Sequence, residues 1–266
     1  MQGNTDLWLL DGTRTSRFTF DPAGQDRFPI WSPDGGRIVS ESDRTGPRNL
    51  HVRDASGAGA EALLVDSAQA KLAFDWSADG RFLLYYGIDP HTRRDLWVRP
   101  MAGDQTSWVF LKTPFEELGG RFSPDGRWVA YMSNESGRLE IYVRPFGPPA
   151  ASGVAAGTAA PASGQWQVST AGGIFPSWRA DGQELYYLGP DGTMMAAPIA
   201  VRGAAVEPGT PVALFPTRIY GGGVDTQQGR QYDVTRDGRF RINTVLDDAT
   251  TTPITLIQNW QPDVKQ

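Results

Sequence analysis

Hydrophobic and polar positions alternate in short runs along most of this chain. In Leu50–Arg53, Leu96–Arg99 and Ile141–Arg144 every second residue is aliphatic, and clusters of Gly, Asp, Asn or Pro separate such runs. A period of two, bounded by turn residues, is typical of half-buried antiparallel strands and not of helices. The pattern therefore predicts an all-β chain.

One motif, an apolar residue followed three positions later by Asp-Gly, returns five times. The copies are Trp31–Gly35, Trp76–Gly80, Phe122–Gly126, Trp178–Gly182 and Val234–Gly238, and their Asp residues are 45, 46, 56 and 56 positions apart. Asp-Gly between two apolar runs is a strong hairpin signal, because Gly accepts the positive φ of a tight turn. A period of about 40–50 residues is typical of the blades of a propeller.

Each repeat predicts four strands. Strands A and B flank the Asp-Gly turn, strand C is the alternating run (more weakly Met194–Ala197 in the fourth repeat), and strand D follows a second turn. The D strands are expected at Ala62–Val65, Trp108–Leu111, Trp166–Val168 and Val212–Phe215. The predicted fold is a β-propeller of four-stranded antiparallel blades.

The two ends of the chain hold the parts of one further blade. Leu7–Leu10 and Arg17–Phe20 match strands C and D, whereas the last repeat offers an A/B pair around Asp237 and a C-like strand at Ile254–Ile257. Because open sheet edges invite aggregation, we expect the N-terminal strands to complete the C-terminal blade and close the ring. Five blades are the preferred count, and six with one incomplete are the alternative.

Length and composition restrict the function. The 266 residues suit a single domain (1–266), in which the Pro/Ala/Gly-rich segment 147–164 is predicted to be a flexible loop within one blade. A net charge of −5 argues against a nucleic-acid partner. The chain contains no Cys, no apolar run long enough to span a membrane, and a polar start, Met1–Asp6, unlike a signal peptide.

The repeats FPIWSPDGGRIVSESDRTGPRNLHV and GRFSPDGRWVAYMSNESGRLEIYVRPF resemble the TolB-like (WD40-like, PD40) propeller repeat. The segment from Trp166 to Trp260 is similar to the C-terminal propeller of bacterial membrane-bound Ser/Thr kinases and related regulators. The resemblance implies a sensor or scaffold propeller in the periplasm or another extracytoplasmic compartment. Kinase activity does not transfer, because the sequence has no Gly-rich phosphate loop, HRD or DFG motif.

In a propeller the B–C and D–A loops surround one mouth of the channel, where binding concentrates. The leading interpretation is a non-enzymatic module that recognises a protein, peptide or carbohydrate on this face. The residues expected to bind are Arg27, Arg44, Asp89, Arg94, Arg121 and Arg230. Alternatively, any one of these residues is only a solvent-exposed charge at the rim of the channel mouth and binds no ligand.

An enzyme is the competing interpretation, because paired carboxylates perform glycoside hydrolysis. For a glycoside hydrolase or polysaccharide lyase the candidates are Glu41, Asp43, Glu116, Glu117 and Glu135, with His91 as a general base. Adjacent Glu116 and Glu117 are expected to point to opposite sides of an extended chain. No G-x-S-x-G elbow occurs, and two distant His without Cys give no zinc spacing. No cofactor is predicted; a calcium ion in the channel is neither supported nor excluded by the sequence.

Overall fold

The computed structural model describes residues 5–22, 24–148, 164–219, 226 and 229–245, and within them it contains strands and turns but no helix. The contacts divide the chain into two compact units. The first comprises residues 1–118 and 149–160, and the second comprises 119–148 and 161–266. The boundary falls within one strand, after Leu118.

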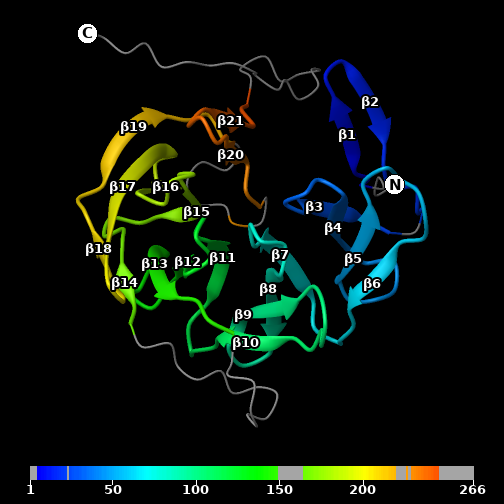
Figure 1. Ribbon diagram of the computed structural model, residues 1–266, viewed down its shortest axis with the longest axis horizontal. Coiled ribbons are helices and arrows are strands. Elements are labelled where there is room, and N and C mark those ends of the chain that lie inside the picture. The colour runs from blue at the N-terminus through cyan, green and yellow to red at the C-terminus, as the bar shows by residue number, and fades with distance from the viewer. Residues whose placement is uncertain (1–4, 23, 149–163, 220–225, 227–228, 246–266) are drawn as a thin grey trace. The chain divides into compact units, whose positions relative to one another are not determined.

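The first unit contains two four-stranded antiparallel sheets and one hairpin (Figure 1). The first sheet is β3 (Asp26–Trp31), β4 (Arg37–Ser42), β5 (Asn49–Asp54) and β6 (Ala62–Val65). The second is β7 (Lys71–Trp76), β8 (Phe82–Asp89), β9 (Arg93–Pro100) and β10 (Trp108–Leu111). The hairpin is β1 (Trp8–Asp11) and β2 (Arg14–Arg17).

The second unit continues the pattern. One sheet is β11 (Glu117–Phe122), β12 (Trp128–Ser133), β13 (Glu140–Pro145) and β14 (Trp166–Gln167). The next is β15 (Ile174–Trp178), β16 (Glu184–Leu188), β17 (Thr193–Arg202), β18 (Ala205–Pro208) and β19 (Val212–Pro216), followed by the hairpin β20 (Tyr232–Val234) and β21 (Phe240–Ile242). The predicted four-stranded antiparallel sheets are confirmed, and β6 and β10 begin and end at the predicted residues.

The repeated Asp residues have the predicted structural role. Ser32 Oγ donates to Asp34 Oδ1 (2.5 Å) and accepts the backbone N–H of Arg37 (2.8 Å), while Asp34 also accepts the N–H of Gly36 (3.0 Å). The turn is completed by Gly35 at a φ of 72°. Ser77 and Ser123 repeat the same bonds at the corresponding turns, while Thr235 donates to Asp237 and accepts the backbone N–H of Arg239, four residues on.

A second recurring feature, absent from our prediction, is a kink in strand A. Phe28, Gly119 and Phe175 occupy the same position of their repeats and have φ values of 53°, 67° and 55°. In β3 and β15 a β-bulge accompanies the kink, and such bulges bend a strand and re-aim its side chains. At Gly119 a Cβ would lie 2.4 Å from Met132 Cε, so packing within the second unit also requires glycine there.

The core of the first unit lies between its two four-stranded sheets. Val39 and Leu50 of one sheet and Ala73, Leu83 and Tyr85 of the other belong to one buried cluster. Burial of each large aliphatic side chain contributes about 1.5–3 kcal/mol, so this contact fixes the two sheets against each other. The loops at the strand ends are thereby held on a rigid support.

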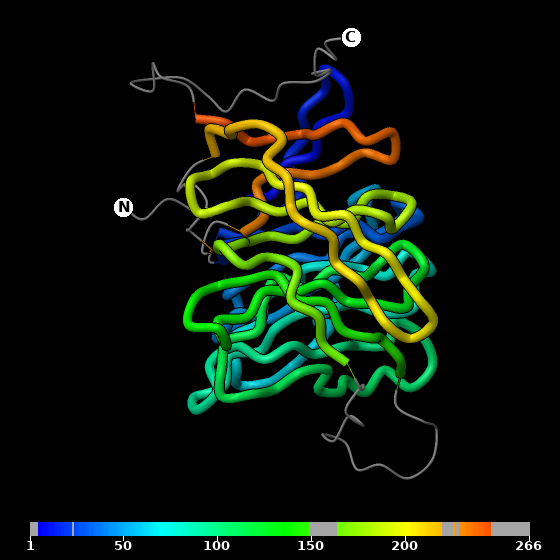
Figure 2. The backbone as a smooth tube through the Cα atoms, turned by 90° about the vertical axis from the view of Figure 1, so that its left-hand side faces the viewer, coloured from blue at the N-terminus to red at the C-terminus, as the bar shows by residue number. Residues whose placement is uncertain are grey.

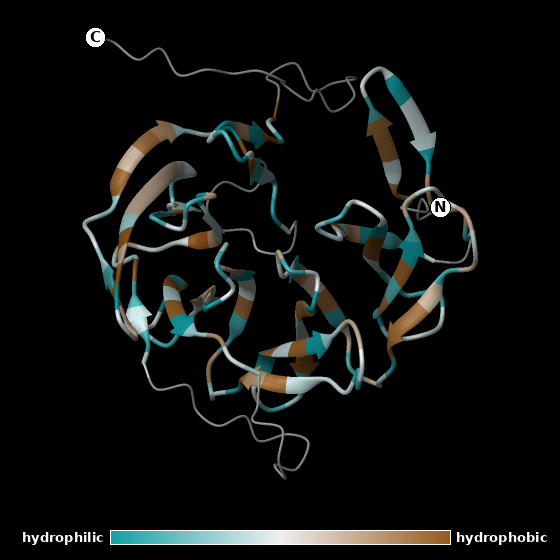
Figure 3. Ribbon diagram, viewed as in Figure 1, coloured by the Kyte–Doolittle hydropathy of each residue, from teal (hydrophilic) through white to brown (hydrophobic). Residues whose placement is uncertain are grey.

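The chain ends differ from expectation. Among the described residues β1–β2 and β20–β21 are separate two-stranded sheets, so the predicted closure of the ring by their pairing is not found. The predicted strand Ile254–Ile257 lies outside the described residues, as does most of segment 147–164. Figure 3 shows β1 as largely hydrophobic, and its Trp8 and Leu10 are 54% and 68% exposed.

Strand β18 was not predicted. It forms a hairpin with the long strand β17, joined at Gly203 with a φ of 63°, and Figure 2 shows this yellow hairpin beside β19. The only sequence signal was Gly203-Ala204 between Val201 and Val206, a weaker turn than Asp-Gly.

Candidate functional site

The strands extend further into the predicted loops than the sequence indicated. Arg27 lies in β3 and Glu41 in β4, where the two are cross-strand partners, and Glu117 and Arg121 lie in β11. Between β8 and β9 only residues 90–92 lie outside the strands, because Asp89 pairs with Arg93, so Asp89 and Arg94 are also strand residues. The placement of these residues in loops was therefore wrong.

Arg44 is the centre of an ionic cluster at one end of the first sheet. Its Nη2 lies 2.6 Å from Asp26 Oδ1 and 2.9 Å from Glu61 Oε1, and its Nε donates to Ser42 Oγ at 2.9 Å and lies 3.8 Å from Asp21 Oδ2. Asp26 is fully buried, and the Nδ1 of His51, also buried, lies 3.3 Å from Glu61. Arg44 was predicted as a ligand-binding residue, but its charge is compensated within the fold.

Glu41 is the candidate acid with the most perturbed environment. Its side chain is 3% exposed, and Arg48 Nε lies 3.3 Å from its Oε1. Burial raises the pKa of Glu41 to about 7, although the nearby Arg48 and Arg27 oppose the shift. The neighbouring Asp43 accepts the backbone N–H of Gln25 at 2.7 Å, which is a structural role.

The end of the second sheet brings several predicted residues together. Lys112 Nζ donates to Asp89 Oδ2 at 2.6 Å, and Asp89 also accepts the backbone N–H groups of His91 and Thr92. These hydrogen bonds, that from Lys112 first, lower the pKa of Asp89. Asp89 is therefore held as an anion at the β8–β9 turn, while the side chain of His91 is exposed.

Glu116 forms salt bridges with two guanidinium groups at the start of β9, directly after the same turn. Arg93 Nη1 donates to its Oε1 at 2.8 Å and Arg94 Nη1 to its Oε2 at 2.7 Å. Arg94 also stacks over the Tyr86 ring, 5.6 Å from the centroid. Glu117, which follows Glu116 in the chain, is 1% exposed and accepts a hydrogen bond from Thr113.

Two large hydrophobic side chains stand beside these ion pairs. Ile88 is 41% exposed and is the cross-strand partner of Arg94, and Phe115, next to Glu116, is 42% exposed. We name this surface the β8–β9 patch; it comprises Ile88, Asp89, Arg93, Arg94, Lys112, Phe115 and Glu116. Four residues of the patch were not predicted from the sequence: Ile88, Arg93, Lys112 and Phe115. A signal was present in Lys112, which is one of only three lysines and precedes the acidic pair.

The remaining candidates belong to the second unit. Glu135 accepts a bond from Gln165, Arg230 Nη1 lies 3.5 Å from Asp233 Oδ1, and the backbone carbonyl of Arg121 accepts the indole N–H of Trp178. Each of these three residues therefore has its interaction partner within the second unit. Among the described residues there is no group of three or more side chains that could hold a metal ion. The same residues contain no helix long and apolar enough to cross a membrane.

The comparisons with known proteins concern the fold. No protein-family model and no curated protein matches the chain. TolB from Acinetobacter baumannii matches with a TM-score of 0.62 at 15% identity, over 89% of this chain and 53% of its own. A puromycin-hydrolyzing peptidase from Mycobacterium tuberculosis matches with 0.59 at 18% identity, over 91% of this chain and 40% of its own.

A third structure, oligogalacturonate lyase from Vibrio parahaemolyticus, matches with a TM-score of 0.57 at 11% identity, over 91% of this chain and 69% of its own. The chain thus spans about half the length of the Acinetobacter protein and less of the peptidase. These similarities, at low identity, bear on the fold alone. The chain has the TolB-like β-propeller fold.

Proposed function

We propose that this chain is a non-enzymatic recognition module that binds a protein or peptide through the β8–β9 patch. The observation that carries the proposal is the pair of exposed hydrophobic side chains, Ile88 and Phe115, set among salt bridges at the end of a rigid sheet. Protein-binding surfaces typically combine apolar anchors with a polar rim, and they lie on loops that a scaffold holds in place.

The charges of the patch favour recognition over catalysis. Glu116 is bound by two arginines and Asp89 by Lys112, and a carboxylate held in this way is unsuited to donate a proton. The same salt bridges fix the side chains before a partner arrives, which reduces the entropic cost of binding. Arg94, partly exposed and stacked on Tyr86, is positioned to meet a carboxylate of the partner.

Site-specific photo-crosslinking tests the proposal. A photoreactive phenylalanine replaces Phe115 in one variant and Asp104, in the exposed β9–β10 turn at the other end of the same sheet, in a control variant. We expect one discrete adduct from position 115 that excess unlabelled chain competes away, and none from position 104. Equal labelling from both positions, or none from position 115, would contradict the proposal.

The competing function is a carbohydrate-active hydrolase or lyase. The observation in its favour is Glu41, whose raised pKa of about 7 suits a general acid. Turnover of chromogenic glycosides, esters and oligogalacturonate is compared between the wild type and Glu41→Gln, Glu116→Gln and Glu135→Gln. Turnover that one substitution abolishes, with circular dichroism unchanged, would replace the recognition proposal.

A further inference from the structure

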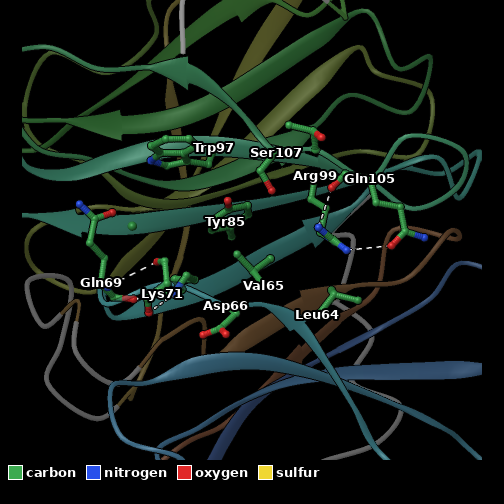
Figure 4. A pocket seen from close by; sticks show the side chains of 13 residues that line it. Leu64, Val65, Asp66, Gln69, Lys71, Tyr85, Trp97, Arg99, Gln105 and Ser107 are labelled. Carbon is green, nitrogen blue, oxygen red and sulfur yellow. Dashed lines mark hydrogen bonds between the residues drawn. The ribbon is translucent and has the colours of Figure 1, made fainter. Parts of the chain in front are cut away.

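A cavity of about 340 Å³ lies within the first unit, and none of its lining residues belongs to the β8–β9 patch. Leu64 and Val65 of β6 form one wall, and Tyr85 of β8 with Trp97 and Arg99 of β9 form the opposite wall (Figure 4). The segments 66–71 and 105–107 complete the lining. This volume is at the lower end of the range of small-molecule pockets.

Gly87 of β8 also lines the cavity. A Cβ there would lie 3.3 Å from Gln69 Oε1 and 3.4 Å from Trp97 Nε1, a tight fit that a small shift of Gln69 relieves. The inner part of the same sheet contact is filled by the buried cluster that includes Leu83 and Tyr85. The cavity lies beside this cluster, against which its lining residues Leu64, Val65 and Trp97 pack.

Two cations border the cavity, and their described hydrogen-bond acceptors are neutral. Lys71 Nζ donates to Asn49 Oδ1 and to the backbone carbonyls of Gln69 and Ser67. Arg99 donates from its two terminal nitrogens to the backbone carbonyl and the side chain of Gln105, at 2.6 and 2.8 Å. The lining contains one carboxylate, that of the exposed Asp66.

Burial shifts the pKa values of these two side chains in the direction expected for cations whose hydrogen-bond partners are neutral. It lowers the pKa of Lys71 to about 8, against the attraction of Asp66, and it lowers the pKa of Arg99. Arg99 Nε is buried and has no hydrogen-bond acceptor among the described residues. A buried donor of this kind is costly unless a ligand or a water molecule satisfies it.

The side chains of the two walls determine what kind of uncharged group fits the cavity. The Tyr85 and Trp97 rings are nearly parallel, with centroids 6.5 Å apart and planes 21° apart. Leu64 and Val65 present aliphatic groups from the opposite side. A flat or apolar body fits between these walls, and an anionic group fits beside the guanidinium.

We propose that this cavity binds a small aromatic carboxylic acid, whose carboxylate pairs with Arg99 and whose ring lies between Trp97 and β6. The site is independent of the β8–β9 patch. Arg99 supplies the specificity for charge, because a neutral ligand would leave its Nε–H and its charge without compensation.

The first unit contains a matched control. Arg53 occupies the position of β5 that Arg99 has in β9 and also has a buried Nε without a described acceptor, but it does not line this cavity. Its two terminal nitrogens donate to the neutral backbone carbonyls of Phe18 and Gly57. Arg53→Gln therefore repeats the chemical change of Arg99→Gln at a site without the cavity. Leu64→Trp provides a second variant, which fills the cavity and keeps Arg99.

The test is ligand-observed saturation-transfer NMR with benzoate, phenylacetate and indole-3-acetate, each compared with its neutral amide. We expect at least one acid to bind, its amide to bind at least tenfold more weakly, and Arg99→Gln and Leu64→Trp to lose at least tenfold in affinity while Arg53→Gln retains it. If Arg99→Gln does not fold, Leu64→Trp decides. No binding of any acid at 5 mM, equal binding of acids and amides, or equal losses in Arg53→Gln and Arg99→Gln would overturn the proposal.

Discussion

Acidic side chains at the two ends of the first sheet differ in environment. At the turn end, hydrogen bonds from Ser32 and the backbone N–H of Gly36 lower the pKa of Asp34, which is exposed. At the loop end, burial raises the pKa of Glu41 to about 7. The turn carboxylate is thus stabilised as an anion, whereas the loop carboxylate is destabilised as one. The difference teaches that hydrogen bonds at the turn end stabilise the charged form of Asp34, whereas burial at the loop end makes the charged form of Glu41 costly.

The largest predicted effect is a difference between the wild type and Glu41→Gln in how the free energy of unfolding depends on pH. Glu41 has a pKa of about 7 in the folded chain against an ordinary value of 4.5, so the folded chain retains a proton that the unfolded chain has released. The free energy of unfolding must then fall as the pH rises from about 4.5 to 7. Relative to Glu41→Gln, we expect a fall on the order of 2–3 kcal/mol between pH 4.5 and 8, measured by urea denaturation.

Glu207→Gln, which removes a carboxylate that is 54% exposed, is the control for loss of charge alone. Parallel pH profiles for the wild type and Glu41→Gln would show that Glu41 is an ordinary carboxylate. The contrast between the two ends of the sheet would then disappear.

The next effect concerns the turn end. Ser77 is 2% exposed, and its hydroxyl donates to Asp79 and accepts the N–H of the buried Phe82. Ser77→Ala leaves that N–H without a partner, so we expect a loss of about 1–2 kcal/mol in chemical denaturation. The exposed Ser136→Ala should change stability by less than about 0.5 kcal/mol. Equal effects of the two substitutions would refute the structural role of the turn serine.

The smallest effect on stability is expected at the β8–β9 patch. Arg94→Ala removes a partly exposed ion pair with Glu116, which contributes about 0–1 kcal/mol. Thermal unfolding should therefore change little, while the photo-adduct from position 115 should weaken at least fivefold. A large loss of stability with unchanged crosslinking would assign Arg94 to the fold instead.

The fold was predictable because its signals are local and repeated. The Asp-Gly turn at Asp79 and the alternation of Leu96–Arg99 each specify a strand boundary or a face, and five copies reinforce one another. The kink at Phe28 was not predictable, since a bulky residue before Pro29 gives no sign of a positive φ.

The candidate site was predictable only in part. Asp89, Arg94 and Glu116 were expected on one face. In the structure Lys112 pairs with Asp89, while Arg93 and Arg94 pair with Glu116. Which charges pair depends on strand register and side-chain reach, which the alternation of residues does not encode. The cavity beside Arg99 depends on the contact between two sheets, so no motif in the sequence announces it. The similarity to kinase-linked propellers stays a prediction.

The most direct test of the recognition proposal is to identify the partner by crosslinking and to measure its affinity for two matched variants. Phe115 and Leu63 are both 42% exposed in the first unit, but only Phe115 belongs to the β8–β9 patch. By isothermal titration calorimetry we expect Phe115→Ser to weaken binding at least tenfold, about 1.4 kcal/mol, and Leu63→Ser to leave it unchanged. Unchanged affinity for Phe115→Ser, or equal losses in both variants, would contradict the account.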